Sequence, residues 1–153
     1  MSAELELAEE MVAVTPRLDA EVFTEDDPES PEFAERLERV TDAMFERYFH
    51  PEFELRSLLE AFGGGSYEGR EGLKRWVHDV AVGFSSFVRR GIEVTEVSPG
   101  TVLIGLHVDA VGRISGAPIT FETWSVGRFE DGRLRSFETV ETRDKALNML
   151  KRP

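Results

Sequence analysis

Three turn signals divide the second half of the chain into four short segments that have the apolar patterning of β-strands. The signals are Pro99-Gly100, the glycine-rich corner at residues 112–116, and the Asp131-Gly132 pair. Strands joined by connections this short pair in succession as antiparallel neighbours. The sequence therefore predicts a meander of four strands, over residues 92–98, 101–111, 117–129 and 134–142.

Helical periodicity precedes this meander. Ser30 and Pro31 supply an N-cap and a proline at the first helical position, and the apolar spacing that follows predicts a helix over residues 31–48. A second apolar stripe begins at Arg70 and predicts a helix that ends before Gly91.

One further strand and one further helix complete the pattern. Residues 53–59 alternate as a short strand, and residues 143–150 are expected to form a terminal helix. Helices segregated from antiparallel strands define the α+β class. We expect a curved antiparallel β-sheet that wraps around the N-terminal helices and encloses a conical cavity, and this cavity is the expected ligand site.

The first 35 residues carry almost all of the excess negative charge. They hold twelve acids and one base, whereas the whole chain has 30 acids and 18 bases. A block of like charge repels itself, so we expect residues 1–30 to form a solvated acidic arm, with a short helix ended by Thr15-Pro16. The folded domain then spans residues 31–150. Its acidic and basic residues nearly balance and form no basic stripe, which argues against nucleic acid as a partner.

Residue types exclude several kinds of site. The chain contains no cysteine, so it has no disulfide, thiolate metal site or cysteine nucleophile. His50, His78 and His107 lack the close spacing of metal ligands, and no phosphate-binding glycine loop follows a strand, so we expect neither a metal nor a cofactor. No apolar run reaches the length of a membrane span and no signal peptide is evident, so we expect a cytoplasmic protein without membrane contact.

Strand parity predicts the residues that line the cavity. Val102 and Ile104 lie on a wholly apolar strand face, which we expect to meet the helices. The partners across the meander follow if the corner at residues 112–116 is a symmetric three-residue turn and Asp131-Gly132 a two-residue turn. A shift of one residue at either turn would send these partners to the opposite face. With the two turns as stated, the inner wall gains Trp124, Val126, Phe137 and Thr139.

Two aromatic side chains on the helices are further candidates for the cavity wall. Tyr48 ends the apolar stripe of the first predicted helix, and Trp76 lies on the stripe of the second. Each is expected either to face the ligand or to pack in the core.

The same register makes Glu122 and Glu141 cross-strand neighbours beside Trp124. Desolvation and mutual repulsion would raise the pKa of such carboxyls and suit them to general acid–base catalysis. The alternative is that both lie ionised and idle at a solvated rim.

The opposite face of the sheet is expected to be too apolar for water. It would carry Leu103, His107, Ile119, Phe121 and Val140. A second subunit would cover this face, so we expect a homodimer through the convex side of the sheet.

Four short runs together carry a family resemblance, namely Tyr67–Trp76, Gly112–Gly116, Asp131–Leu134 and Thr142–Leu147. In order and spacing they resemble a SnoaL-like protein of the NTF2-like superfamily, over about residues 33–150. The resemblance implies a fold like that of ketosteroid isomerase and polyketide cyclases, a homodimer, and a conical cavity for a small apolar ligand.

The resemblance also implies a third candidate carboxylate. In ketosteroid-isomerase-like relatives the general base is an acid on the first strand, and Glu60, nine residues before Gly69, has a similar place. The chain departs from that pattern because the acid is glutamate and no proline follows it.

Two functions stay open. The first is acid–base catalysis by an isomerase, cyclase or hydratase on a small apolar substrate, in which Glu122, Glu141 or Glu60 moves the proton. The second is a non-catalytic NTF2-like module for ligand binding or dimerisation, with the same cavity but without a convergent acid and donor.

Overall fold

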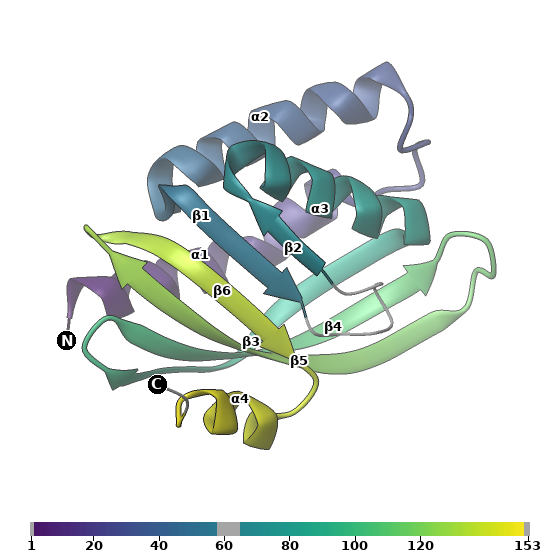
Figure 1. The fold of residues 1–153 in the computed structure, drawn as a ribbon. Coiled ribbons are helices and arrows are strands. Elements are labelled where there is room, and N and C mark those ends of the chain that lie inside the picture. Colours follow the sequence, from purple (N-terminus) through teal and green to yellow (C-terminus); the bar gives the residue numbers. More distant parts are fainter. Residues whose placement is uncertain (1, 58–64, 152–153) are drawn as a thin grey trace.

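The structure is a computed structural model that describes residues 2–57 and 65–151. Over these residues the chain forms helices and one sheet (Figure 1). The helices are α1 (Ala3–Val22), α2 (Pro31–Tyr48), α3 (Gly69–Gly83) and α4 (Arg143–Met149). The strands are β1 (Phe49–Ser57), β2 (Gly65–Glu68), β3 (Phe84–Ser98), β4 (Thr101–Gly112), β5 (Pro118–Glu130) and β6 (Arg133–Val140).

The strands form one six-stranded sheet in the order β2-β1-β6-β5-β4-β3. The antiparallel meander from β3 to β6 is as predicted. The sheet as a whole is mixed, because β1 pairs with β6 in parallel while β2 folds back on β1 as the outer strand. Helix α3 then carries the chain from the β2 edge to the β3 edge. The predicted α+β class is confirmed.

Helices cover both faces of the sheet. Helices α1, α2 and α3 lie on one side, and the short helix α4 lies on the other (Figure 1). Two apolar clusters fill the space between the sheet and the first three helices, and a third lies beneath α4. The larger part of the apolar core is therefore on the side of α1, α2 and α3.

Helix α2 has the predicted bounds, because the signals at its start act as expected. The Ser30 side chain accepts a hydrogen bond from the Phe33 backbone N–H at 3.2 Å, and Pro31 is the first helical residue. Helix α3 is shorter than predicted, since it ends at Gly83 and Phe84 begins β3. The longer β3 pairs with β4 along its whole length. This pairing satisfies the backbone N–H and C=O groups of β4 that would lack a partner if these residues formed a helix.

The acidic N-terminal segment is packed on the sheet, so the expectation of a solvated arm is wrong. Helix α1 continues through Pro16 to Val22, and its glutamates flank a buried, mostly apolar stripe. The stripe crosses β3 closely at Gly91, where an added Cβ would lie 2.6 Å from Val12 Cγ1. The apolar spacing outweighs the charge, because the glutamates need only one solvated side of the helix.

The register across β5 differs from the prediction by one residue, for two separate reasons. Gly112 and Ala117 are joined by a backbone hydrogen bond, so the β4–β5 connection has four residues between them rather than three. The Asp131-Gly132 turn has two residues, as predicted, but a bulge beside Arg128 shifts the pairing of β5 with β6. Strand β5 therefore faces the opposite way, while β6 keeps its predicted face.

The outer face is correspondingly different from the prediction. Phe121 turns inward and packs on the helix-side cluster, while Leu103 and Val140 are covered by α4. Beside α4 the face carries a polar network instead, in which Asp109 accepts from Thr120 at 3.1 Å and pairs with Arg90. The apolar patch on which the dimer prediction was based is therefore not present on this face.

Candidate functional site

A cavity of about 150 Å³ lies between the sheet and helices α1, α2 and α3. Most of its wall is aliphatic or aromatic, so it suits a small apolar molecule. The aromatic side chains that line it are Phe23, Phe49, Phe53, Trp76, Phe87 and Phe137.

Four predicted ligand-binding residues line this cavity, namely Trp76, Ile104, Phe137 and Thr139. The other four do not reach it, and two of these are buried in the core on the same side of the sheet. Val102 faces the helices as expected but is fully buried in the core cluster, and Tyr48 is buried in the same cluster. Burial raises the pKa of the Tyr48 hydroxyl, and its hydrogen bond with Glu10 raises that pKa further. Tyr48 therefore serves packing at the end of α2 rather than the cavity wall.

Trp124 and Val126 lie on the other side of the sheet, so their predicted place in the cavity wall is wrong. They pack with Leu103 and Val140 beneath α4. The Trp124 ring lies over Gly105, its partner across the strands. Thr123 and Ser125 take their places in the cavity wall, because the one-residue shift of register reverses the face of β5.

The predicted pair of carboxylates does not form. Glu122 is exposed on the outer side of the sheet, where it accepts a hydrogen bond from Trp124 Nε1 at 3.0 Å. Glu141 is also exposed, and its hydrogen bond with the Lys145 ammonium lowers the pKa of its carboxyl. Neither lines the cavity, so the two carboxylates do not meet in an apolar interior. Glu60 lies outside the described residues.

An ion pair of two residues that are not among the predicted site residues lies in the cavity wall. Asp19 on α1 is 3% exposed, and Arg89 on β3 meets it with three hydrogen bonds. The Arg89 guanidinium also lies 5.1 Å from the centre of the Trp76 ring, a cation–π contact. Among the described residues, Asp19 and Arg89 are the charged side chains of the cavity lining.

The signal for Asp19 is present in the sequence. Met11, Thr15, Asp19 and Val22 are spaced by four, four and three residues, so Asp19 occupies the buried stripe of one continuous helix. A carboxylate in such a stripe needs a buried partner. The signal was missed because Pro16 was expected to end the helix.

The sheet adds a row of hydroxyl groups to the cavity wall. Ser57, Thr139 and Ser125 are neighbours in the register of β1, β6 and β5. The Ser125 and Thr139 hydroxyl oxygens lie 2.8 Å apart and bond to one another. This row and the ion pair give the apolar cavity two polar places.

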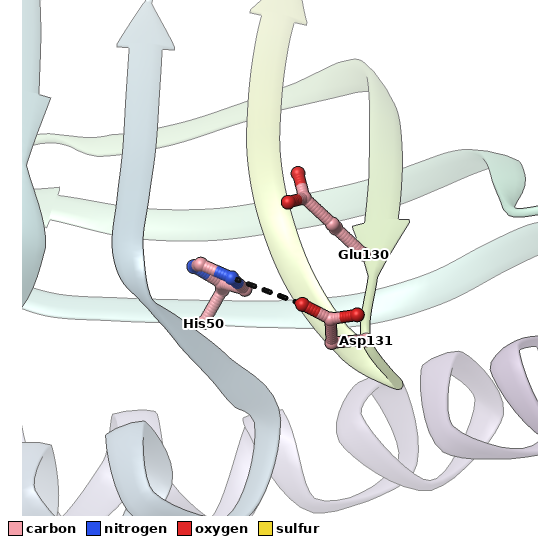
Figure 2. Close-up of side chains that lie close together, drawn as sticks. All are labelled: His50, Glu130 and Asp131. Atoms are coloured by element: carbon pink, nitrogen blue, oxygen red, sulfur yellow. Dashed lines mark ion pairs between the residues drawn. The ribbon is translucent and has the colours of Figure 1, made fainter.

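One group of potential metal ligands lies away from the cavity, at the turn between β5 and β6. His50, Glu130 and Asp131 bring their ligand atoms within 4.8 Å of one another (Figure 2). The Glu52 backbone N–H donates to His50 Nδ1 at 3.0 Å, so the proton of the neutral ring is on Nε2. Nε2 lies 3.8 Å from Asp131 Oδ2 and carries that proton, whereas a metal would need the Nε2 lone pair. The arrangement therefore fits a weak polar contact at the turn better than a metal site.

Among the helices of the described residues, none combines the length and apolar character that crossing a membrane requires.

The curved sheet, the three covering helices and the cavity between them together define an α+β protein of the NTF2-like class. The SnoaL-like domain model matches residues 32–137, so the chain belongs to the SnoaL-like family, and the predicted resemblance is confirmed. A comparison with curated proteins finds no match.

Solved structures with the same fold cover from about three quarters to almost all of the chain. An NTF2-like protein of unknown function from Burkholderia pseudomallei is 15% identical with a TM-score of 0.68, covering 99% of this chain and 100% of that one. TerC, crystallised with polyporic acid, is 15% identical with a TM-score of 0.67 and covers 99% and 100%. A protein of ketosteroid isomerase-like fold from Catenulispora acidiphila, in complex with trimethylamine, is 12% identical with a TM-score of 0.57 and covers 74% and 83%.

Proposed function

We propose that this protein binds a small, largely apolar molecule in the cavity between the sheet and helices α1, α2 and α3. The observation that carries the proposal is the cavity itself, because an apolar wall with two polar places can both bury and orient a ligand. Among the structures of the same fold, TerC was co-crystallised with polyporic acid and the Catenulispora acidiphila protein is in complex with trimethylamine.

A fluorescent apolar probe tests this proposal. N-phenyl-1-naphthylamine gains fluorescence when it leaves water, and we expect saturable binding with one site per chain. Val77 on α3 lines the cavity, so Val77→Phe should fill it and weaken binding at least tenfold. Val82→Phe on the same helix is the matched control, because Val82 is 49% exposed and does not line the cavity. Equal binding to both variants would place the probe elsewhere and overturn the proposal.

Acid–base catalysis in the same cavity, by an isomerase, cyclase or hydratase, is the second candidate. Among the described residues, Asp19 is the carboxylate that lines the cavity, but three hydrogen bonds from Arg89 occupy its oxygens. The proposal therefore depends on Glu60, which the family resemblance indicates. Exchange of the α-protons of 2-tetralone in deuterated water, followed by NMR, tests it. Exchange that is faster than in buffer alone and is lost in Glu60→Gln supports this function. A wild-type rate equal to that in buffer alone contradicts it.

A homodimer and a cytoplasmic location remain predictions. The dimer was predicted through a face that carries Arg90, Asp109 and Thr120 beside α4, so any partner there would meet polar groups. Sedimentation equilibrium decides the oligomeric state directly. A monomer at all concentrations measured would contradict the dimer.

A further inference from the structure

We propose that Arg89 is the hydrogen-bond donor that orients the ligand, and that the group it takes is a neutral oxygen acceptor such as a carbonyl. The inference deepens the proposed binding function and rests on it. It concerns the chemistry of the ligand at one end of the cavity, where α1, α3 and β3 meet.

The first step is to see which guanidinium nitrogens of Arg89 already have a hydrogen-bond acceptor. Arg89 Nε donates to Asp19 Oδ2 at 2.9 Å, and Nη2 donates to Oδ1 at 2.8 Å. Within the part of the chain that the structure describes, Nη1 has no acceptor. The Arg89 side chain is 24% exposed, whereas that of Asp19 is 4% exposed. Arg89 therefore keeps N–H donors available at the cavity wall after its partner is satisfied.

The second step is the fixed position of these donors. The guanidinium lies 5.1 Å from the centre of the Trp76 ring and 5.9 Å from that of Phe87. The Arg89 backbone N–H also donates to Asp19 Oδ2 at 2.9 Å, so one carboxylate holds both the backbone and the side chain. A donor held in this way loses little conformational entropy when a ligand binds, which favours specificity.

The third step is the balance of charge. Asp19 compensates Arg89, and the rest of the cavity lining formed by described residues is uncharged. An anionic ligand would leave water without meeting a free counter-charge, and its desolvation would oppose binding. A neutral carbonyl oxygen accepts from Nη1 without that penalty. The apolar body of the ligand then lies against the aromatic wall.

The hydroxyl row is the other polar place, and it differs in kind. Ser125 and Thr139 already bond to one another at 2.8 Å, and hydroxyls act as donors or acceptors. They can adapt to a second polar group of either type. Arg89 can only donate, so it is the group that selects for an acceptor.

Matched naphthalene probes test the inference. 2-Acetylnaphthalene carries a carbonyl, and 2-ethylnaphthalene has nearly the same shape without one. We expect the acetyl probe to bind the wild type about tenfold more tightly, as befits a hydrogen bond from a charged donor. We also expect 2-naphthoate to bind more weakly than the acetyl probe, and tighter binding of this anion would overturn the preference for a neutral ligand.

Two variants identify Arg89 as the donor. Asp19→Leu combined with Arg89→Met removes the pair as a whole, so no buried charge is left alone, and the preference for the acetyl probe should vanish. Arg89→Lys keeps the charge opposite Asp19 but removes the Nη1 donor, so it should reduce the preference for the acetyl probe. This variant provides the test if the double variant does not fold. Arg39→Met is the control, because Arg39 is an exposed residue of α2 that pairs with Glu21.

The outcomes separate the inference from the function beneath it. If neither neutral probe binds the wild type, the proposed binding function fails. If both bind the wild type equally, or the acetyl preference survives in both variants, the function stands and the role of Arg89 is wrong.

Discussion

Asp19 on α1 accepts three hydrogen bonds from Arg89 on β3, 70 residues away in the chain. The backbone N–H and Nε both reach Oδ2 at 2.9 Å, and Nη2 reaches Oδ1 at 2.8 Å. The contact joins the acidic N-terminal segment to the edge strand of the sheet. It also makes α1 a wall of the cavity, so the segment with the most unbalanced charge is part of the candidate site.

Asp19→Ala should lower the free energy of unfolding by about 3 kcal/mol, because it leaves the largely buried Arg89 cation without its partner. Urea unfolding followed by circular dichroism measures this change. The control is Glu21→Ala on the same helix. Its partner Arg39 is 60% exposed, so the loss should be below about 1 kcal/mol. Equal losses in the two variants would mean that burial adds nothing to the Asp19 contact.

Removing residues 1–29 should abolish cooperative unfolding, although the family match begins only at residue 32. The truncated chain would expose the two helix-side clusters, of which Met11 and Val12 cover one and Val22 and Phe23 the other. Strong binding of anilinonaphthalene sulfonate and a broad thermal transition would show the exposed surface. A truncated chain that unfolds as sharply as the full chain would restore the sequence prediction of an independent arm.

The positions of most helices and strands could be predicted because local signals mark them. Helix α2 combines an N-cap, a first-turn proline and one continuous apolar stripe, and its predicted and observed bounds agree. The Asp131-Gly132 pair likewise forms the two-residue turn expected of it, with both residues at positive φ. The predicted N-terminal helix is shorter than α1, because a proline such as Pro16 usually ends a helix whereas here the apolar spacing continues on both sides of it.

The cavity wall was predicted less well because it depends on register. Ile104 and Phe137 were placed correctly, since β4 and β6 kept their predicted faces. Trp124 and Val126 were misplaced by a connection one residue longer than expected and by a bulge beside Arg128. Neither feature has a distinctive local sequence, and a strand with apolar residues on both faces does not reveal which one is inward.

Gly105→Ala should lower the free energy of unfolding by about 2 kcal/mol, because the added methyl group overpacks the outer core. Its Cβ would lie 2.4 Å from Cζ3 of the Trp124 ring, which is buried beneath α4. The Arg143 guanidinium lies 6.0 Å from the centre of that ring and pairs with Glu93, so a displaced ring would also loosen the start of α4. Urea unfolding measures the loss.

Gly83→Ala is the matched control for this substitution. An added Cβ at Gly83 meets no atom within 4 Å, and the residue lies at the end of α3 with a φ that other residues adopt. Stability should change by less than about 1 kcal/mol, in either direction. A loss as large as that of Gly105→Ala would show that the effect comes from glycine replacement in general and not from the ring.

The chain has two tyrosines, and both should titrate above the ordinary value of about 10 in the folded protein. Burial raises the pKa of Tyr67, and its hydrogen bond to Asp79 at 2.9 Å raises that pKa further. The same two causes act on Tyr48, where the carboxylate is that of Glu10. A raised pKa means that the folded state holds the proton more tightly than the unfolded state. The stabilising contribution is therefore complete below about pH 10 and is lost as the pH rises through the raised pKa values.

Absorbance of the tyrosinate band against pH measures this shift, with the protein in urea as the unfolded reference. The folded curve should lie above the unfolded one, and Asp79→Asn should move the Tyr67 part of it downward because the neighbouring negative charge is gone. Tyr48→Phe leaves Tyr67 alone and so assigns that part of the curve. Coincident curves for the folded and unfolded protein would show that the two hydroxyls are as well solvated as free tyrosine, contrary to their burial beside α1 and α3.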